Sequence, residues 1–118
     1  MFNREKIEGA MLKADKAFSI FIRKRDEPHG CITCGRHVPW KEADCGHFMS
    51  RECQSTRYNE QNCNLQCREC NSKDDKEAYA LAIDRRYGEG TADKLRVLSK
   101  QFCKRNKIDF KEIERKYH

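Results

Sequence analysis

Two pairs of cysteines constrain the fold of this chain more than any other feature of its sequence. They are Cys31-Ile-Thr-Cys34 and Cys67-Arg-Glu-Cys70. Each pair presents two sulfurs from one tight turn, and two such turns complete a tetrahedral four-thiolate site for zinc. The intervening residues 35–66 exceed the spacing of a compact zinc ribbon, so we expect a functional insert there. The pattern predicts a closed structural zinc site. A redox role for either pair is the alternative, although no βαβ pattern flanks them.

The composition explains why the chain needs such a site. At 118 residues it lies near the lower size limit for a domain that builds its own core. Hydrophobic residues make up 37% of the chain and charged residues another 37%, so bound zinc would compensate for a small apolar core. We expect one domain over residues 1–118.

The amino-terminal segment and the net charge indicate where the protein is located and what kind of partner it binds. The segment has no apolar stretch followed by a small-residue cleavage site. No part of the chain approaches the roughly 20 apolar residues of a membrane span. We therefore expect a cytoplasmic protein without membrane contact, in which cysteines serve as metal ligands rather than disulfides. The net charge of +6 favours a polyanionic partner, but a solvated basic surface explains it equally well.

Hydrophobic periodicity predicts an α+β fold that is mostly helical, with helices on both sides of the cysteine-rich centre. Residues 1–30 should form an amphipathic helix over about 4–26, because apolar side chains recur there at helical spacing. Pro28 and Gly30 then interrupt the pattern. The apolar positions are Ile7, Met11, Ala14, Phe18 and Phe21.

The centre, residues 31–87, is predicted to be the metal-bound core. Up to Asn71 it is polar and lacks a helical period, which indicates short strands and loops. A helix over about 72–87 should follow. It would carry Asp74 and Asp75 in its first turn, where carboxylates favour the positive end of the helix dipole.

The last part, residues 88–118, is predicted to add two helices. The first spans about 91–104 and places Phe102 on its apolar face. The second begins at Asp109, where Glu112 three residues later completes a start that resembles a capping box.

Four cysteines lie outside the two pairs. Cysteine often serves as a small buried apolar residue, and this is the expectation for Cys45, Cys63 and Cys103. Cys53 lies in a polar stretch, and the sequence assigns it no role.

One histidine and two asparagines stand in a specific order around the second cysteine pair. His47 lies between the pairs, Asn62 lies five residues before the second pair, and Asn71 follows that pair directly. A lone histidine would say little about function. The order of all three residues relative to the cysteines is what indicates a catalytic site.

This order resembles that of the HNH, or ββα-metal, nucleases. Within that superfamily, the runs DCGHFMSR and STRYNEQNCNLQCRECN are similar to the NinG (Rap) recombination nucleases of lambdoid phages, and the similarity extends over about residues 10–90. The resemblance implies a zinc-stapled ββα-metal core and a metal-dependent endonuclease that acts on branched DNA in recombination. It also implies a location inside a phage-infected bacterium, with host or phage recombination proteins as partners.

The chemistry of phosphodiester hydrolysis suggests a role for each of these residues. A neutral histidine near pH 7 can take the proton of the attacking water, so His47 is the candidate general base. Mg²⁺ or Mn²⁺ held by oxygen ligands would stabilise the phosphate and the leaving oxygen, and Asn71 can supply one oxygen. By the resemblance, Asn62 would bind the loop that carries His47 and orient its ring. For His47, a zinc ligand or a purely structural residue are the alternatives.

The sequence departs from the wider HNH pattern directly before His47. A carboxylate metal ligand often precedes the histidine in that superfamily, whereas this chain has Gly46. The nearest carboxylate is Asp44, which would face the opposite side of a regular strand. A bulge at Gly46 would bring the two together, and Asp44 is therefore a candidate ligand of the catalytic metal. Arg51 and Arg57 are candidate phosphate contacts, with ordinary solvated arginines as the alternative.

Two other functions stay open at this point. A non-enzymatic zinc module that binds nucleic acid or protein explains the cysteines and the charge, but it leaves the order of His47, Asn62 and Asn71 as coincidence. An HNH nuclease with a packaging or restriction role would have the same site. A homodimer would suit symmetric cuts in a DNA junction. The amphipathic amino-terminal helix could supply the contact, but its apolar face could equally cover the zinc core.

Overall fold

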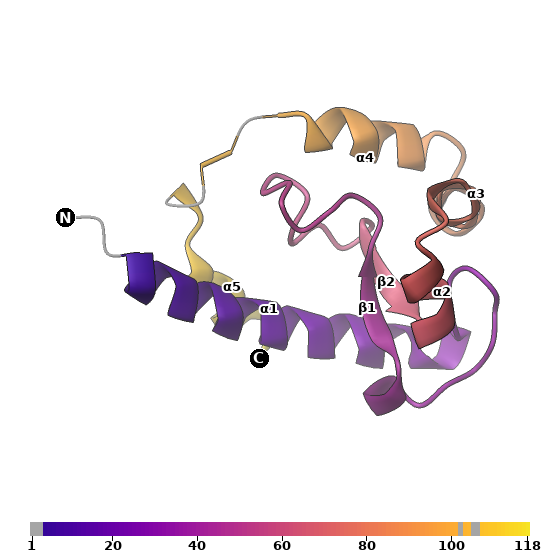
Figure 1. The fold of residues 1–118 in the computed structure, drawn as a ribbon, viewed down its shortest axis with the longest axis horizontal. Coiled ribbons are helices and arrows are strands. Elements are labelled where there is room, and N and C mark those ends of the chain that lie inside the picture. Colours follow the sequence, from indigo (N-terminus) through magenta and orange to yellow (C-terminus); the bar gives the residue numbers. More distant parts are fainter. Residues whose placement is uncertain (1–3, 102, 105–106) are drawn as a thin grey trace.

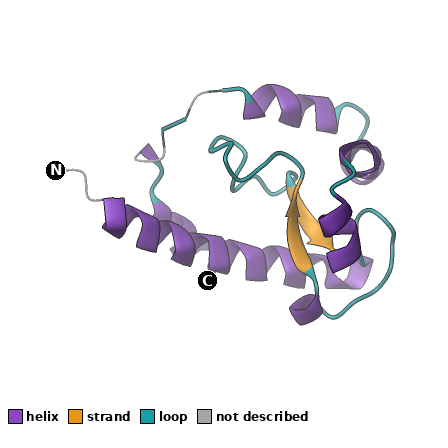
Figure 2. Ribbon diagram, in the orientation of Figure 1, coloured by secondary structure: helices purple, strands orange, loops and turns teal. Residues whose placement is uncertain are grey.

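The computed structural model describes residues 4–101, 103–104 and 107–118, and most of these residues are helical. A two-stranded sheet lies at the centre with helices around it (Figure 2). In chain order the elements are α1 (Arg4–Asp26), β1 (Asp44–His47), β2 (Cys63–Gln66), α2 (Arg68–Lys73), α3 (Lys76–Tyr87), α4 (Thr91–Ser99) and α5 (Phe110–Tyr117). Among the described residues, no helix has the length and apolarity needed to cross a membrane.

The long helix α1 supports the rest of the molecule. It runs along one side, with the sheet on its carboxyl-terminal half and α5 packed alongside it (Figure 1). The buried face carries Ala14, Ala17, Phe18 and Ile22, which confirms the predicted amphipathic helix. The chain turns away at Gly30, whose φ is 79° and where a Cβ atom would lie 2.8 Å from the carbonyl oxygen of Gly35.

The sheet is a regular antiparallel ladder of four residue pairs. Asp44 pairs with Gln66 and His47 pairs with Cys63, without an extra residue in either strand. The bulge predicted at Gly46 is therefore wrong. Glycine at this position instead leaves room for the side-chain amide of Gln66, which a Cβ atom would displace.

The helix predicted over residues 72–87 is two helices. It begins earlier, because Arg68 already starts α2, and it breaks where Asp74 adopts a left-handed conformation with φ 51°. Asp75 then caps α3 by accepting a hydrogen bond from Ala78 N at 3.1 Å. Aspartate side chains compete with the helical backbone in this way. The two acidic residues therefore form the break between the helices rather than a first turn.

The carboxyl-terminal part also differs from the prediction. α4 ends at Ser99 rather than near residue 104, and Phe102 lies outside the described residues. The start of α5 agrees with the prediction, because Asp109 accepts a hydrogen bond from Glu112 N at 3.1 Å. The Tyr117 ring at the end of α5 packs on α1, with its centroid 4.8 Å from those of both Phe18 and Phe21.

Buried apolar side chains form three small clusters. One lies between β1, α3 and α4, one between α1, α5 and β2, and one around the two cysteine pairs. The main members of the first cluster are Phe48, Tyr79, Ile83 and Leu95. Those of the second are Phe18, Ile22 and Tyr117, and those of the third are Cys31, Leu65 and Cys67. Each cluster is small, which agrees with the expectation that the chain depends on a further stabilising element.

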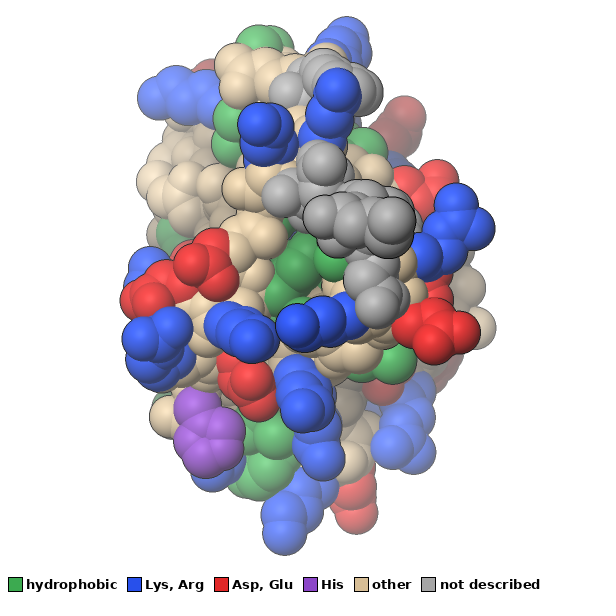
Figure 3. Space-filling model, turned by 90° about the vertical axis from the view of Figure 1, so that its left-hand side faces the viewer, with side chains coloured by type: hydrophobic (Ala, Val, Ile, Leu, Met, Phe, Trp, Pro, Cys, Tyr) green, Lys and Arg blue, Asp and Glu red, His purple; other side chains and the backbone are tan. Residues whose placement is uncertain are grey.

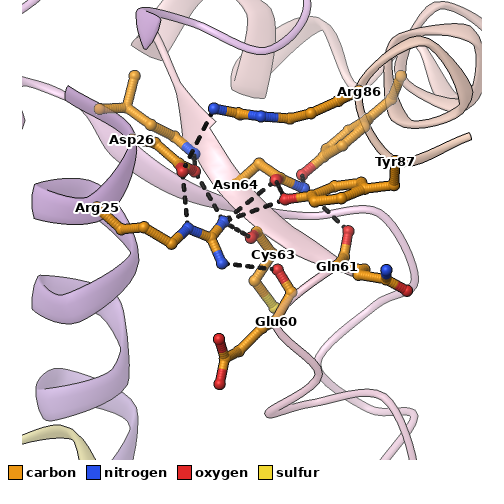
Figure 4. Close-up of polar contacts among 10 residues, drawn as sticks. Arg25, Asp26, Glu60, Gln61, Cys63, Asn64, Arg86 and Tyr87 are labelled. Atoms are coloured by element: carbon orange, nitrogen blue, oxygen red, sulfur yellow. Dashed lines mark hydrogen bonds and ion pairs between the residues drawn. The ribbon is translucent and has the colours of Figure 1, made fainter. Parts of the chain in front are cut away.

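A buried polar network joins α1, β2 and α3 (Figure 4). Asp26, 1% exposed, pairs with Arg25 at 2.7 Å and Arg86 at 3.6 Å. It also accepts the Leu65 backbone N–H at 3.0 Å. Because all of its partners are in place, the buried carboxylate fixes β2 on α1 instead of destabilising the fold.

A four-cysteine cluster and a candidate active-site cleft

The two cysteine pairs meet in space as one cluster. All four sulfurs lie within 4.8 Å of one another, and the sulfurs of Cys34 and Cys67 are 3.8 Å apart. A zinc ion with Zn–S bonds of about 2.3 Å in tetrahedral geometry places its sulfurs about 3.8 Å apart. The cluster formed by Cys31, Cys34, Cys67 and Cys70 therefore fits a zinc ion.

Local backbone geometry builds each half of this cluster. In the first half, Gly35 takes a φ of 78° and donates its N–H to Cys31 O at 2.8 Å. In the second half, Cys67 is the N-cap of α2, and its sulfur accepts the N–H of Cys70 at 3.4 Å. Such N–H donors stabilise thiolates. Both turns are formed by residues adjacent in sequence.

A cleft of about 660 Å³ lies between α1, β1 and the junction of α2 with α3. It brings together four of the predicted site residues, Asp44, His47, Arg51 and Asn71. Its other lining residues are Asp15, Phe18, Ser19, Cys45, Ser50, Ser72, Asp74 and Lys76. The wall is mostly polar and carries both signs of charge, as a site for a hydrated ion and a phosphate would.

Asp44 and Asn71 lie side by side on one wall of this cleft. The Asn71 amide donates to the Asp44 carboxylate, with 3.0 Å between Nδ2 and Oδ2. This leaves the Asn71 carbonyl oxygen as an acceptor. β1 is an edge strand, and Asp44 and His47 both line the cleft although the strand has no bulge. One carboxylate and one amide oxygen suit Mg²⁺, which keeps several waters and takes substrate phosphate oxygens as ligands.

His47 ends β1 and is held from two sides. Its Nε2 lies 3.2 Å from the backbone oxygen of Arg57, and its own carbonyl accepts the ammonium of Lys76 at 3.0 Å. The pKa of His47 is lowered to about 4, mainly by burial and in part by the charges of Arg51 and Arg57, while hydrogen bonds to the backbone of Arg57 and Cys45 oppose the shift. The imidazole is therefore neutral near pH 7. With one nitrogen donating to Arg57 O, the other keeps its lone pair.

Asn62 is fully buried and does not line the cleft. Its Oδ1 accepts the Met49 N–H at 2.8 Å, and its Nδ2 donates to Met49 O at 3.1 Å and Thr56 O at 3.2 Å. Met49 lies two residues after His47. Asn62 thus fixes the start of the loop that follows His47, the position in which the family resemblance expects an orienting residue.

The two arginines predicted to bind phosphate lie in different environments. Arg51 is exposed and lines the cleft. Arg57 is only 6% exposed, and its guanidinium donates to Asp15 at 2.5 and 2.9 Å and to Arg51 O at 2.7 Å. The prediction for Arg57 is therefore corrected, because a phosphate would have to displace this buried ion pair. Arg57 joins the loop to α1.

Two residues of the cleft, Asp15 and Lys76, were not predicted from the sequence. Asp15 binds both Arg57 and the Tyr58 hydroxyl, the latter at 2.7 Å. A charged residue next to Ala14 on the buried side of a helix was a signal that could have indicated it. Lys76, which holds the His47 carbonyl and pairs with Asp74 at 2.8 Å, gave no such signal.

The four remaining cysteines also differ in their environments. Cys63 is fully buried as expected, but Cys45 and Cys103 are only partly buried, and Cys103 lies outside any helix. Cys53 is partly buried and belongs to neither group of potential metal ligands found among the described residues. Cys45 and Cys63 do form such a group, together with His47.

Comparison with known proteins places the chain in a family. Residues 5–118 match the family described as Bacteriophage Lambda NinG protein. Neither the curated proteins nor the solved structures give a match. Because the match covers nearly the whole chain, including both cysteine pairs and the cleft, this protein belongs to the NinG family.

Proposed function

We propose that the chain is a metal-dependent DNA endonuclease of the HNH kind, with β1, β2 and α2 as its ββα-metal core. One observation carries the proposal. A single cleft holds a neutral histidine, His47, beside a carboxylate–amide pair, Asp44 and Asn71, with the exposed arginine Arg51 at its edge. These are the groups that hydrolysis of a phosphodiester requires.

Each of these residues has a defined part in the reaction. Asp44 and Asn71 would hold a divalent ion, Mg²⁺ or Mn²⁺, which supplies charge stabilisation to the phosphate and the leaving 3′ oxygen. His47 accepts the proton of the attacking water on the ring nitrogen that does not face Arg57 O. Arg51 binds a phosphate oxygen of the substrate. Asn62 and Lys76 are positioning residues, because they hold the chain on which His47 lies.

The proposed substrate is branched DNA from recombination, inside a phage-infected bacterium. This part rests on the family and on charge. The net charge of +6 suits contacts with phosphates, whose strength falls as salt rises. On the face of the molecule that lies toward the amino-terminal end of α1, lysines and arginines are interspersed with acidic side chains (Figure 3). That end is not a one-sign basic surface, and we propose the cleft as the position of the DNA.

A nicking assay on four-way junctions, D-loops and linear duplexes tests the proposal. Wild-type protein with Mg²⁺ should nick branched DNA fastest, and His47→Ala should lower the rate by about 100-fold or more. The variant should keep the zinc of the four-cysteine cluster and its circular dichroism spectrum. Wild-type protein without any nicking would favour a non-enzymatic zinc module. Equal rates on all three substrates would favour a packaging or restriction role.

Assembly is a further part of the proposal. Symmetric cuts across a junction need two copies of the site, so we propose a homodimer on DNA, with host or phage recombination proteins as further partners. Sedimentation analysis with and without a four-way junction would distinguish a dimer from a monomer.

A further inference from the structure

The geometry points to a second metal site, formed by Cys45, His47 and Cys63, that takes a soft divalent cation such as Zn²⁺ and thereby removes His47 from catalysis. The site is distinct from the four-cysteine cluster. Only its inhibitory effect rests on the proposed nuclease function, because metal binding can be measured without DNA.

The register of the sheet creates this group. Cys45 and His47 are two residues apart on β1, so their side chains share one face of the sheet. Cys63 is the cross-strand partner of His47 and points to the same face. The two sulfurs and one ring nitrogen of His47 all lie within 4.8 Å of one another. One metal ion can contact three atoms at this spacing.

The surroundings of the group suit a metal-bound thiolate on one side and an exchangeable ligand on the other. Cys63 is fully buried, and Asn62 Nδ2 lies 3.8 Å from its sulfur as a donor. The Cys63 thiol itself donates to Arg57 O at 3.6 Å, so a metal ion has to displace this proton, after which the Asn62 donor can orient the thiolate. Cys45 and His47 line the cleft, so a water or another cleft ligand can complete four-fold coordination.

The ligand chemistry selects the cation. Two thiolates and an imidazole favour zinc and other soft or borderline ions over Mg²⁺, which prefers oxygen ligands. Binding replaces the two thiol protons, which go to solvent, and uses the free lone pair of the imidazole. A neutral imidazole has a single lone pair, so a metal-bound His47 has none left to accept the proton of the attacking water. Zinc in this site and general-base catalysis by His47 therefore exclude each other.

Metal stoichiometry and a cobalt spectrum test the binding itself. The purified zinc-bound protein would be titrated with Co²⁺ while the sulfur-to-cobalt absorption is followed, and tightly bound zinc would be counted after dialysis. We expect wild type to bind two ions per chain and Cys45→Ser to bind one. Cys53→Ser is the matched control, because Cys53 lies in neither cluster, and it should bind two.

Two results would overturn the inference. One is a wild type that binds a single ion, with no further sulfur absorption on added cobalt. The other is a Cys45→Ser protein that binds as many ions as wild type. Cys63→Ser provides a second test of the same ligand set, so a folding defect in one variant does not leave the question undecided.

The inhibitory effect has its own measurement. Each variant's nicking rate with Mg²⁺ would be compared between protein that carries zinc in the four-cysteine cluster alone and the same protein loaded with excess Zn²⁺, so that every protein is its own reference. The wild-type rate should fall about tenfold or more, and the Cys45→Ser rate should change by less than about twofold. Equal inhibition of both would refute the regulatory part. If no variant nicks DNA, the nuclease proposal fails, while the stoichiometry still decides on the metal site.

Discussion

The four-cysteine cluster and the cleft are neighbours built by different means. Cys70 belongs to the cluster and Asn71, the next residue of α2, lines the cleft. Successive residues on a helix point about 100° apart, so one short helix can serve both sites. The cluster is formed by two turns that supply one kind of ligand. The cleft is formed by α1, β1, α2 and the loop after β1, and hydrogen bonds hold these segments in place. We therefore expect the cluster to determine stability and the cleft to determine activity.

Removal of zinc should give the largest effect and should damage both regions. The binding free energy of a structural zinc site, on the order of 10 kcal/mol, is part of the folding free energy. A strong chelator, or Cys67→Ala, should therefore abolish cooperative unfolding in a circular dichroism melt. Withdrawal of Mg²⁺ alone should stop nicking and leave the melt unchanged. A zinc-free protein with the melting curve of the zinc-bound form would contradict this division.

Substitutions of the two arginines near the cleft should have different effects, with Arg57→Ala lowering stability and Arg51→Ala weakening DNA binding. Arg57→Ala leaves the mostly buried Asp15 carboxylate without its cationic partner, although Tyr58 still binds it, so we expect a loss of about 3 kcal/mol in the free energy of unfolding. Arg51→Ala should change stability by less than about 0.5 kcal/mol. It should weaken DNA binding and reduce its salt dependence. Denaturant titration and binding isotherms at several salt concentrations would measure both. Similar stability losses in the two variants would count against the assignment.

Substitutions of the two asparagines in the proposed site should also differ, because Asn62→Ala should lower both stability and activity and Asn71→Ala should lower activity alone. Asn62→Ala leaves the backbone groups of Met49 without their partner, so we expect a stability loss of about 2 kcal/mol together with slower nicking. Asn71→Ala removes an exposed side chain and should slow nicking while the unfolding midpoint stays constant. An Asn71 variant with full activity would exclude this residue as a metal ligand.

A change of pH across 6.5 should have the smallest effect on the nicking rate. The pKa of His47 is lowered to about 4, so the imidazole stays neutral as the pH falls through 6.5, the value of an ordinary histidine. The rate, measured with zinc content checked at each pH, should therefore remain nearly constant across 6.5. A rate that halves near 6.5 would show that the ring is exposed to solvent and titrates normally.

The cluster was the easier region to predict, for a physical reason. Each half needs only a Cys-x-x-Cys turn, and such turns are formed by residues close in sequence. The periodic apolar residues likewise identified α1. The break at Asp74 and Asp75 was missed, because the same residues favour both a helix start and a helix interruption. The burial of Arg57 depends on Asp15, a partner far away in the sequence, and no local pattern contains that contact.

The packing of Tyr117 on Phe18 and Phe21 has a consequence for folding kinetics. Most of the chain separates the two partners of this contact, so forming it closes a very long loop at a cost in chain entropy. Contacts of this kind form late and slow the overall rate, whereas the metal-binding turns close locally. In a refolding experiment started by added zinc, we therefore expect metal uptake to precede the docking of α5 on α1.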